Sequence, residues 1–128
     1  MKKILLLLLF VLLLFGAATC PNREIYFKNI FCKYVNGKLN VPLDDYKNTV
    51  DIVTDTFAID VEFAPKWATS IGHSLYASTI LNKKPAILLI TYKGYDGKYV
   101  DILMPIANKY NITVWVIDYY SNTWKKNN

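Results

Sequence analysis

Residues 86–92 are the feature that most constrains the fold, because this run is of strand length and almost continuously apolar. A strand that is apolar on both sides is covered on both faces of its sheet, as central parallel strands of α/β domains are. A stretch of helical character, residues 66–81, precedes the run and begins directly after Pro65, a residue favoured at a helix start. A helix leading into such a strand predicts a parallel crossover and an α/β fold with a mixed sheet.

Two runs of β-branched and aromatic residues, 50–53 and 57–63, flank a polar turn and predict a β-hairpin. Side chains alternate across a strand, so Asp60 and Glu62 point to the same side. In the simplest register, Asp51 lies on the neighbouring strand within reach of Asp60. The hairpin is therefore expected to bring three carboxylates together.

These three carboxylates allow two interpretations. Acids held close together repel one another unless a cation neutralises them, and a set of oxygen ligands suits Mg²⁺ or Mn²⁺ better than zinc. The simpler interpretation is that Asp51, Asp60 and Glu62 are solvated acids on the polar side of an amphipathic hairpin, as is common for an Asp-x-Glu sequence. Spacing alone does not decide between the two. One histidine and two cysteines are too few for a structural zinc site.

The remaining pattern supplies elements on both sides of the hairpin. Apolar residues at helical spacing predict a helix over 23–35, which Asn36-Gly37 terminates, and residues 39–43 predict a short strand. A turn at residues 95–97 precedes a helix that ends near Tyr110.

Four expectations concern details of the second half of the chain. Pro105 is either a kink or the first residue of a second helical segment. Residues 113–117 predict a last buried strand, and residues 121–128 a frayed polar tail. In the helix over 66–81, Ala68, Gly72 and Ala77 are expected to pack closely against the sheet.

The N-terminus has the pattern of a bacterial signal peptide. Lys2 and Lys3 precede an apolar core at residues 4–15, and Gly16-Ala17-Ala18 supplies the small residues of a cleavage site. We therefore expect a signal peptide over residues 1–19, one domain over residues 20–128, and export to the periplasm or the medium. Membrane attachment through a lipid on Cys20 is the alternative.

Charge and cysteine content bear on partners and compartment. Without Lys2 and Lys3 the formal charge falls from +5 to +3, a mildly basic balance that permits a polyanionic partner. Cys20 and Cys32 are a pair that can form a disulfide in an oxidising compartment if Cys20 carries no lipid.

Asp51, the triplet Asp60-Val61-Glu62 on the next strand, and a helix carrying His73 and Tyr76 together resemble the PD-(D/E)xK nuclease superfamily, in particular its RecB-like and Holliday-junction-resolvase-like branches. The resemblance spans most of the domain. It implies a restriction-endonuclease-like αβββαβ core, here with an added C-terminal helix and strand. It also implies a metal held by Asp51, Asp60 and the Val61 carbonyl.

The remaining site residues follow from the same resemblance. The third triplet position, a lysine in the family pattern, is Glu62 here, which implies a metal ligand or general base, and Lys66 is the candidate for a relocated lysine. Glu24 corresponds to an acid on the first helix that leans toward the metal, although an acid in a first helical turn is also favoured by the helix dipole. His73 stands where RecB-like members carry glutamine, and with Tyr76 it implies contacts to substrate.

The function that follows is an exported Mg²⁺- or Mn²⁺-dependent endonuclease that hydrolyses phosphodiester bonds of nucleic acid, with DNA favoured over RNA. The alternative is a catalytically inactive nuclease-fold domain that binds nucleic acid or a cell-envelope partner. A third interpretation is a small structural α/β domain with exposed acids.

Overall fold

The computed structural model describes residues 23–44, 47–92 and 96–127. In chain order the elements are α2 (Arg23–Tyr34), β1 (Lys38–Pro42), β2 (Thr49–Val53), β3 (Phe57–Phe63), the 3₁₀ turn η1 (Ala64–Lys66), α3 (Trp67–Leu81), β4 (Lys84–Thr91), α4 (Gly97–Lys109), β5 (Thr113–Asp118) and β6 (Trp124–Asn127). The described part of the chain is thus an α/β domain, and the expected succession of helix, three strands, helix, strand, helix and strand is confirmed. Pro105 lies inside the single helix α4.

The strands form one mixed sheet in the order β1-β2-β3-β4-β5-β6. β3, β4 and β5 are parallel to one another, while β1 and β2 at one end and β6 at the other are antiparallel to their neighbours. The segment β3–α3–β4 is therefore the parallel crossover predicted from the sequence.

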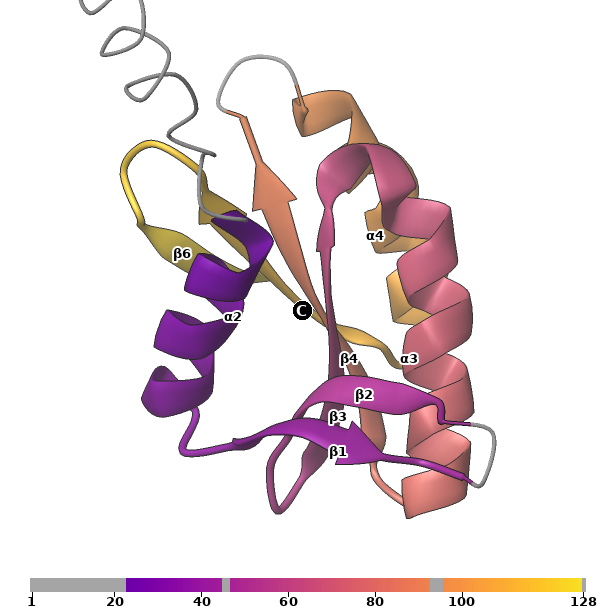
Figure 1. Cartoon of the computed structure of the whole chain (residues 1–128). Helices are drawn as coiled ribbons and strands as arrows, with labels where there is room; N and C mark the ends of the chain where they lie inside the picture. Colours follow the sequence, from indigo (N-terminus) through magenta and orange to yellow (C-terminus); the bar gives the residue numbers. More distant parts are fainter. Residues whose placement is uncertain (1–22, 45–46, 93–95, 128) are drawn as a thin grey trace, which may run out of the picture.

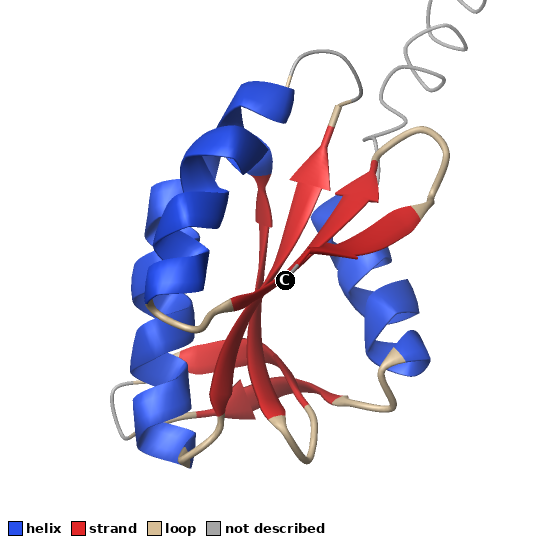
Figure 2. Cartoon of the chain, turned by 180° about the vertical axis from the view of Figure 1, so that it is seen from behind, coloured by secondary structure: helices blue, strands red, loops and turns tan. Residues whose placement is uncertain are grey.

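Helices cover both faces of this sheet, α2 on one face and α3 with α4 on the other (Figures 1 and 2). Phe27 and Phe31 of α2 pack on one side of β4, and Leu103 and Ala107 of α4 pack on the other side. The middle of β4 is completely buried because its side chains alternate between these two layers. The prediction of a central strand covered on both faces is confirmed.

Asn36 and Gly37 terminate α2, and their backbone geometry explains why these two residue types occur here. Asn36 has a φ of 53°, and the Gly37 N–H donates to the Cys32 carbonyl oxygen at 2.9 Å, a common helix termination. A Cβ atom on Gly37 would lie 2.7 Å from Ile52 Cγ2 on β2. Glycine is therefore needed here because helix and strand approach closely.

The expectation of a frayed tail over residues 121–128 is wrong for residues 124–127. Trp124–Asn127 forms the edge strand β6, and the Trp124 ring packs on Tyr34 and Phe31 of α2 at centroid distances of 4.9 and 6.0 Å. The polar composition suggested fraying, but one tryptophan on the inner side of the strand is enough to hold it against α2.

The expected packing face of α3 is also wrong in part. Ala77 is buried, but Ala68 and Gly72 are exposed, and a Cβ atom added to Gly72 would have no neighbour within 4 Å. The small residues that contact the sheet are serines, Ser70, Ser74 and Ser78. Ser74 and Ser78 donate to carbonyl oxygens of their own helix, which satisfies their buried hydroxyls.

Several expectations lie outside the described residues. These are the signal peptide over residues 1–19, lipid attachment at Cys20, and the Cys20 half of a disulfide with Cys32. Cys32 itself is a buried residue of α2 with a free thiol. Within residues 23–44, 47–92 and 96–127, no helix is long and apolar enough to cross a membrane.

Candidate functional site

The candidate site lies where β2 separates from β3. The two strands pair at Ile52 with Ile59 and at Val53 with Ala58, and β3 continues to Phe63 past the last of these described pairs. Val50 packs on the α3 side of the sheet and Ile52 on the α2 side, so β2 turns sharply about Asp51. We call residues 60–63 the open edge of β3.

Asp51 connects β2 to the open edge of β3, where the two strands are no longer paired. Its Oδ2 accepts a 2.8 Å hydrogen bond from the Val61 backbone N–H, a donor that a neighbouring strand would otherwise satisfy. Its Oδ1 accepts a 2.9 Å bond from the Lys28 ammonium on α2, in an ion pair that is largely buried. Asp51 thus joins the open edge of β3 to α2.

Asp60 is the most buried acid of the site, with 7% of its surface exposed. The Ser70 hydroxyl on α3 donates to its Oδ2 at 2.7 Å, and His73 Nδ1 lies 3.3 Å from its Oδ1. Burial raises the pKa of the Asp60 carboxyl to about 6. The Ser70 bond and His73 oppose this rise, whereas the charges of Asp51 and Glu62 add to it. Asp51 lies near Asp60 along β3, because its carboxylate bonds the backbone N–H of Val61, the residue that follows Asp60.

Glu62 lies farther along the open edge of β3. Its Oε1 accepts a 3.0 Å bond from the Phe63 backbone N–H and lies 3.6 Å from the ammonium of Lys66 in η1. The Lys66 side chain is 66% exposed, so this contact contributes little to stability. The ammonium group of Lys66 is therefore accessible to solvent at the mouth of the site.

Glu24 joins the same group of charges from α2. Burial and the negative charges of Glu62 and Asp51 raise the pKa of the Glu24 carboxyl, and the ammonium groups of Lys28 and Lys66 partly offset the rise. The expected role of Glu24, an acid of the first helix that leans toward a metal, stays a prediction. Glu24, Asp51, Asp60 and Glu62 together form what we call the acid cluster.

A cavity of about 300 Å³ opens beside Asp60 on the α3 side of the sheet. Asp60 lines it together with His73 and Tyr76, two residues that lie on one side of α3 because they are three positions apart. The Tyr76 hydroxyl donates to the carboxylate of Asp44 across the cavity, and the His73 side chain is 64% exposed. The two residues expected to contact substrate thus share a cavity with one of the expected metal ligands.

The donor types in the acid cluster fit a hard divalent cation, because all are carboxylate oxygens and their charges act on one another. As they stand, Lys28 already neutralises Asp51, and His73 lies against Asp60. Within the described residues, no three His, Cys, Asp or Glu side chains come together in a ligating arrangement. A cation bound by Asp51 would therefore compete with Lys28.

Two residues of this site, Lys28 and Ser70, were not predicted from the sequence. Lys28 lies one helical turn after Glu24 on α2, so the i,i+4 spacing of an acid and a base was the signal available. Ser70 gave no signal of its own, since a serine inside a helix is usually neutral in role, and only the packing of α3 on β3 brings it to Asp60.

Comparisons with known proteins add no identification: no family model, no curated protein and no solved structure matches this chain.

Proposed function

We propose that this domain is a nuclease-like phosphodiesterase with a PD-(D/E)xK-type core that uses a divalent metal. The elements α2 to β4 have the order helix, three-stranded meander, helix and parallel strand, and α4 and β5 follow as an added pair. This order is the one expected of an αβββαβ core. From this agreement in the order of elements we propose that the fold is restriction-endonuclease-like.

One observation carries the proposal: the acid cluster gathers at the open edge of β3. A folded chain seldom collects four carboxylates in a partly buried place, because burial and like charge both oppose ionisation. The pKa values of Asp60 and Glu24 are raised for these reasons. Such a destabilised arrangement is typical of a binding or catalytic site rather than of a hairpin surface.

In this proposal, Asp51, Asp60 and Glu62 hold a Mg²⁺ or Mn²⁺ ion, with Glu24 completing the set from α2. When bound, the ion supplies a Lewis acid for the phosphate and lowers the pKa of a water molecule. The protein's own contribution is positional. Ser70 fixes the rotamer of Asp60 through a 2.7 Å bond, and the Val61 N–H fixes that of Asp51.

Two lysines are candidates for the role of the lysine missing from the triplet. Lys66 is exposed beside Glu62 and is free to contact a phosphate oxygen. Lys28 is largely buried against Asp51 and would offset negative charge from inside the site. Their different exposure separates the candidates: loss of Lys66 should weaken substrate binding, whereas loss of Lys28 should weaken the ordering of the acids.

Nucleic acid is the proposed substrate, with DNA favoured over RNA. His73 and Tyr76 line the cavity beside Asp60, where a phosphate group and its sugar would lie next to the acid cluster. The exposed imidazole of His73 supplies a hydrogen-bond donor for a phosphate oxygen, and Tyr76 would do so by exchanging its hydrogen bond to Asp44 for one to the substrate. The basic balance of the chain is compatible with a polyanion.

The test is incubation of the full chain with DNA and with RNA in Mg²⁺, in Mn²⁺ and in EDTA. We expect cleavage only with metal, loss of cleavage in Asp60→Ala, and retained cleavage in Asp55→Ala. Asp55 is the matched control because it is an exposed acid at the turn of the same hairpin. Cleavage that persists in EDTA or in Asp60→Ala would refute the proposed mechanism.

A specific observation favours a second candidate, an inactive domain of this fold that binds nucleic acid or an envelope partner. Both Asp51 oxygens already have partners within the protein, one of them the ammonium of Lys28. In that case the lysine replaces the metal. Binding of nucleic acid without cleavage in any metal is the result that this candidate predicts.

Export remains part of the proposal, on the pattern of residues 1–19. The mass of the protein recovered from expressing cells tests it: a chain that begins after residue 18 or 19 supports cleavage, an added diacylglyceryl mass supports the lipid on Cys20, and an intact Met1 contradicts both.

A further inference from the structure

A group of aromatic side chains lies at the end of the sheet next to the acid cluster. β3, β4 and β5 are parallel, so their carboxyl ends lie at the same edge of the sheet. β3 ends at Phe63, and an aromatic residue directly follows each of the other two strands, Tyr92 after β4 and Tyr119 after β5. The Tyr92 and Tyr119 rings are 4.5 Å apart between centroids, and Phe63 stacks on Tyr92 at 6.2 Å and 10°. In Figure 1 these strand ends and the start of α2 lie together at the top.

Two further tyrosines extend this group into solvent. Tyr120 is 73% exposed and packs edge-on against Tyr119 and Tyr92, at centroid distances of 5.2 and 6.0 Å. Tyr26 of α2 is 43% exposed, and its hydroxyl accepts a 3.4 Å hydrogen bond from the side-chain amide of Asn122. We call Tyr26, Tyr92, Tyr119 and Tyr120 the tyrosine surface.

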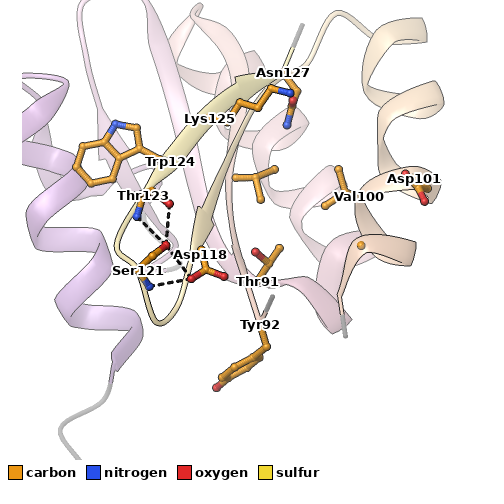
Figure 3. Close-up of a pocket in the computed structure, with 12 residues that line it drawn as sticks. Thr91, Tyr92, Val100, Asp101, Asp118, Ser121, Thr123, Trp124, Lys125 and Asn127 are labelled. Carbon is orange, nitrogen blue, oxygen red and sulfur yellow. Dashed lines mark hydrogen bonds between the residues drawn. The ribbon is translucent and has the colours of Figure 1, made fainter. Parts of the chain in front are cut away.

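The turn that carries Tyr120 is held firmly. Asp118 Oδ1 accepts hydrogen bonds from the Tyr120 N–H at 3.1 Å and from the N–H and hydroxyl of Ser121, both at 2.8 Å. Figure 3 shows the bonds of Ser121 to Asp118 at the edge of a cavity of about 510 Å³, which Tyr92 also lines. A ring on such a turn is already ordered before a ligand binds, which lowers the entropy cost of stacking.

A cation is built into the tyrosine surface. The Arg23 guanidinium lies 4.4 Å from the centre of the Tyr119 ring. Its one hydrogen bond within the described residues is a long one, 3.5 Å to the Tyr119 carbonyl oxygen. Arginine stacked on an aromatic ring keeps donors for a phosphate oxygen.

Two residues that touch the tyrosine surface are chain neighbours of the acid cluster: Phe63 stacks on Tyr92, and the Arg23 guanidinium lies over the Tyr119 ring. Phe63 directly follows Glu62 on β3, and Glu24 directly follows Arg23 on α2. Stacked aromatic rings with an intervening cation are what proteins use to bind the unpaired bases and backbone of single strands. Base pairs in a duplex do not expose their faces to such a surface.

We propose that the tyrosine surface binds the unstacked bases of single-stranded nucleic acid, so that the substrate of the acid cluster is a single strand or an unpaired end. The choice of nucleic acid rests on the proposed function. The bases stack on Tyr120 and its neighbours, and Arg23 pairs with the phosphate that leads toward Glu62.

The test is fluorescence anisotropy of the full chain in EDTA, so that binding is measured without cleavage. The probes are an oligothymidylate of about 15 nucleotides, an oligouridylate of the same length and a matched duplex. We expect tighter binding of a single strand than of the duplex. Tyr120→Leu should weaken single-strand binding about fivefold to a hundredfold, and Tyr120→Phe should retain it.

Tyr110→Leu is the matched control. Tyr110 is a half-exposed tyrosine with the ammonium of Lys109 over its ring, but it follows α4 at the opposite edge of the sheet. Equal losses in Tyr120→Leu and Tyr110→Leu, or no preference for single strands, would overturn the tyrosine surface while metal-dependent cleavage of duplex could still stand. Selective loss in Tyr120→Leu without cleavage in any metal would retain the surface and refute the nuclease.

Discussion

Replacing Asp60 by asparagine should stabilise the metal-free protein at neutral pH. Burial raises the pKa of the Asp60 carboxyl from 3.8 to about 6. Between these two pH values the folded state binds more protons than the unfolded state, so the free energy of unfolding falls as the pH rises through this window. At about 1.36 kcal/mol per pH unit, the free energy of unfolding falls by about 3 kcal/mol in total, and this fall is complete above pH 6. The side-chain amide of the Asp60→Asn variant stays neutral at every pH and avoids this loss.

The assay is thermal and urea unfolding of wild type and Asp60→Asn in EDTA, at a pH below 3.8 and again well above 6. We expect nearly equal stability at the low pH. At the high pH the variant should melt higher by on the order of 10–15 °C, since its amide oxygen still accepts the Ser70 bond. Asp55→Asn controls for the loss of an exposed acid. A difference between wild type and variant that does not change with pH would refute the reasoning from burial.

Three further predictions concern the parts that hold the site. Lys28→Met should lower the metal-free stability by about 1–3 kcal/mol because it leaves the Asp51 charge unpaired, and Mn²⁺ should restore more stability to it than to wild type in a thermal shift assay. Gly37→Ala should cost about 1–3 kcal/mol in urea unfolding, since its Cβ would lie 2.7 Å from Ile52 Cγ2. Trp124→Ala should lower the free energy of unfolding by about 2 kcal/mol, which is less than for a fully buried tryptophan. No loss of stability in this variant would mean that residues 124–127 are frayed in solution.

The fold was predictable where the sequence pattern is local and strong. The hairpin is marked by two β-branched and aromatic runs about a polar turn, and the apolar run of β4 is too short for a buried helix. With the helix that precedes β4, these signals predict the parallel crossover. β6 was missed because its evidence is a single tryptophan, Trp124, whose partner Tyr34 is distant in sequence. The serine face of α3 was missed because small polar residues carry no apolar period.

The candidate site was predictable in its acids but not in their surroundings. Alternation along β3 places Asp60 beside Glu62, and hairpin register places Asp51 near them, both from local geometry alone. Lys28 and Ser70 come from helices on opposite faces of the sheet, so their contacts depend on how α2 and α3 pack. Long-range packing of this kind leaves no spacing rule in the sequence.

The central claim is that the acid cluster binds a divalent cation, and a titration of the full chain with Mn²⁺, followed by the electron paramagnetic resonance of the free ion, tests it most directly. Wild type and Asp55→Asn are expected to bind one ion per chain. Asp51→Asn and Asp60→Asn should bind it about tenfold more weakly or not at all. No binding by wild type, or equal binding by all four proteins, would contradict the claim.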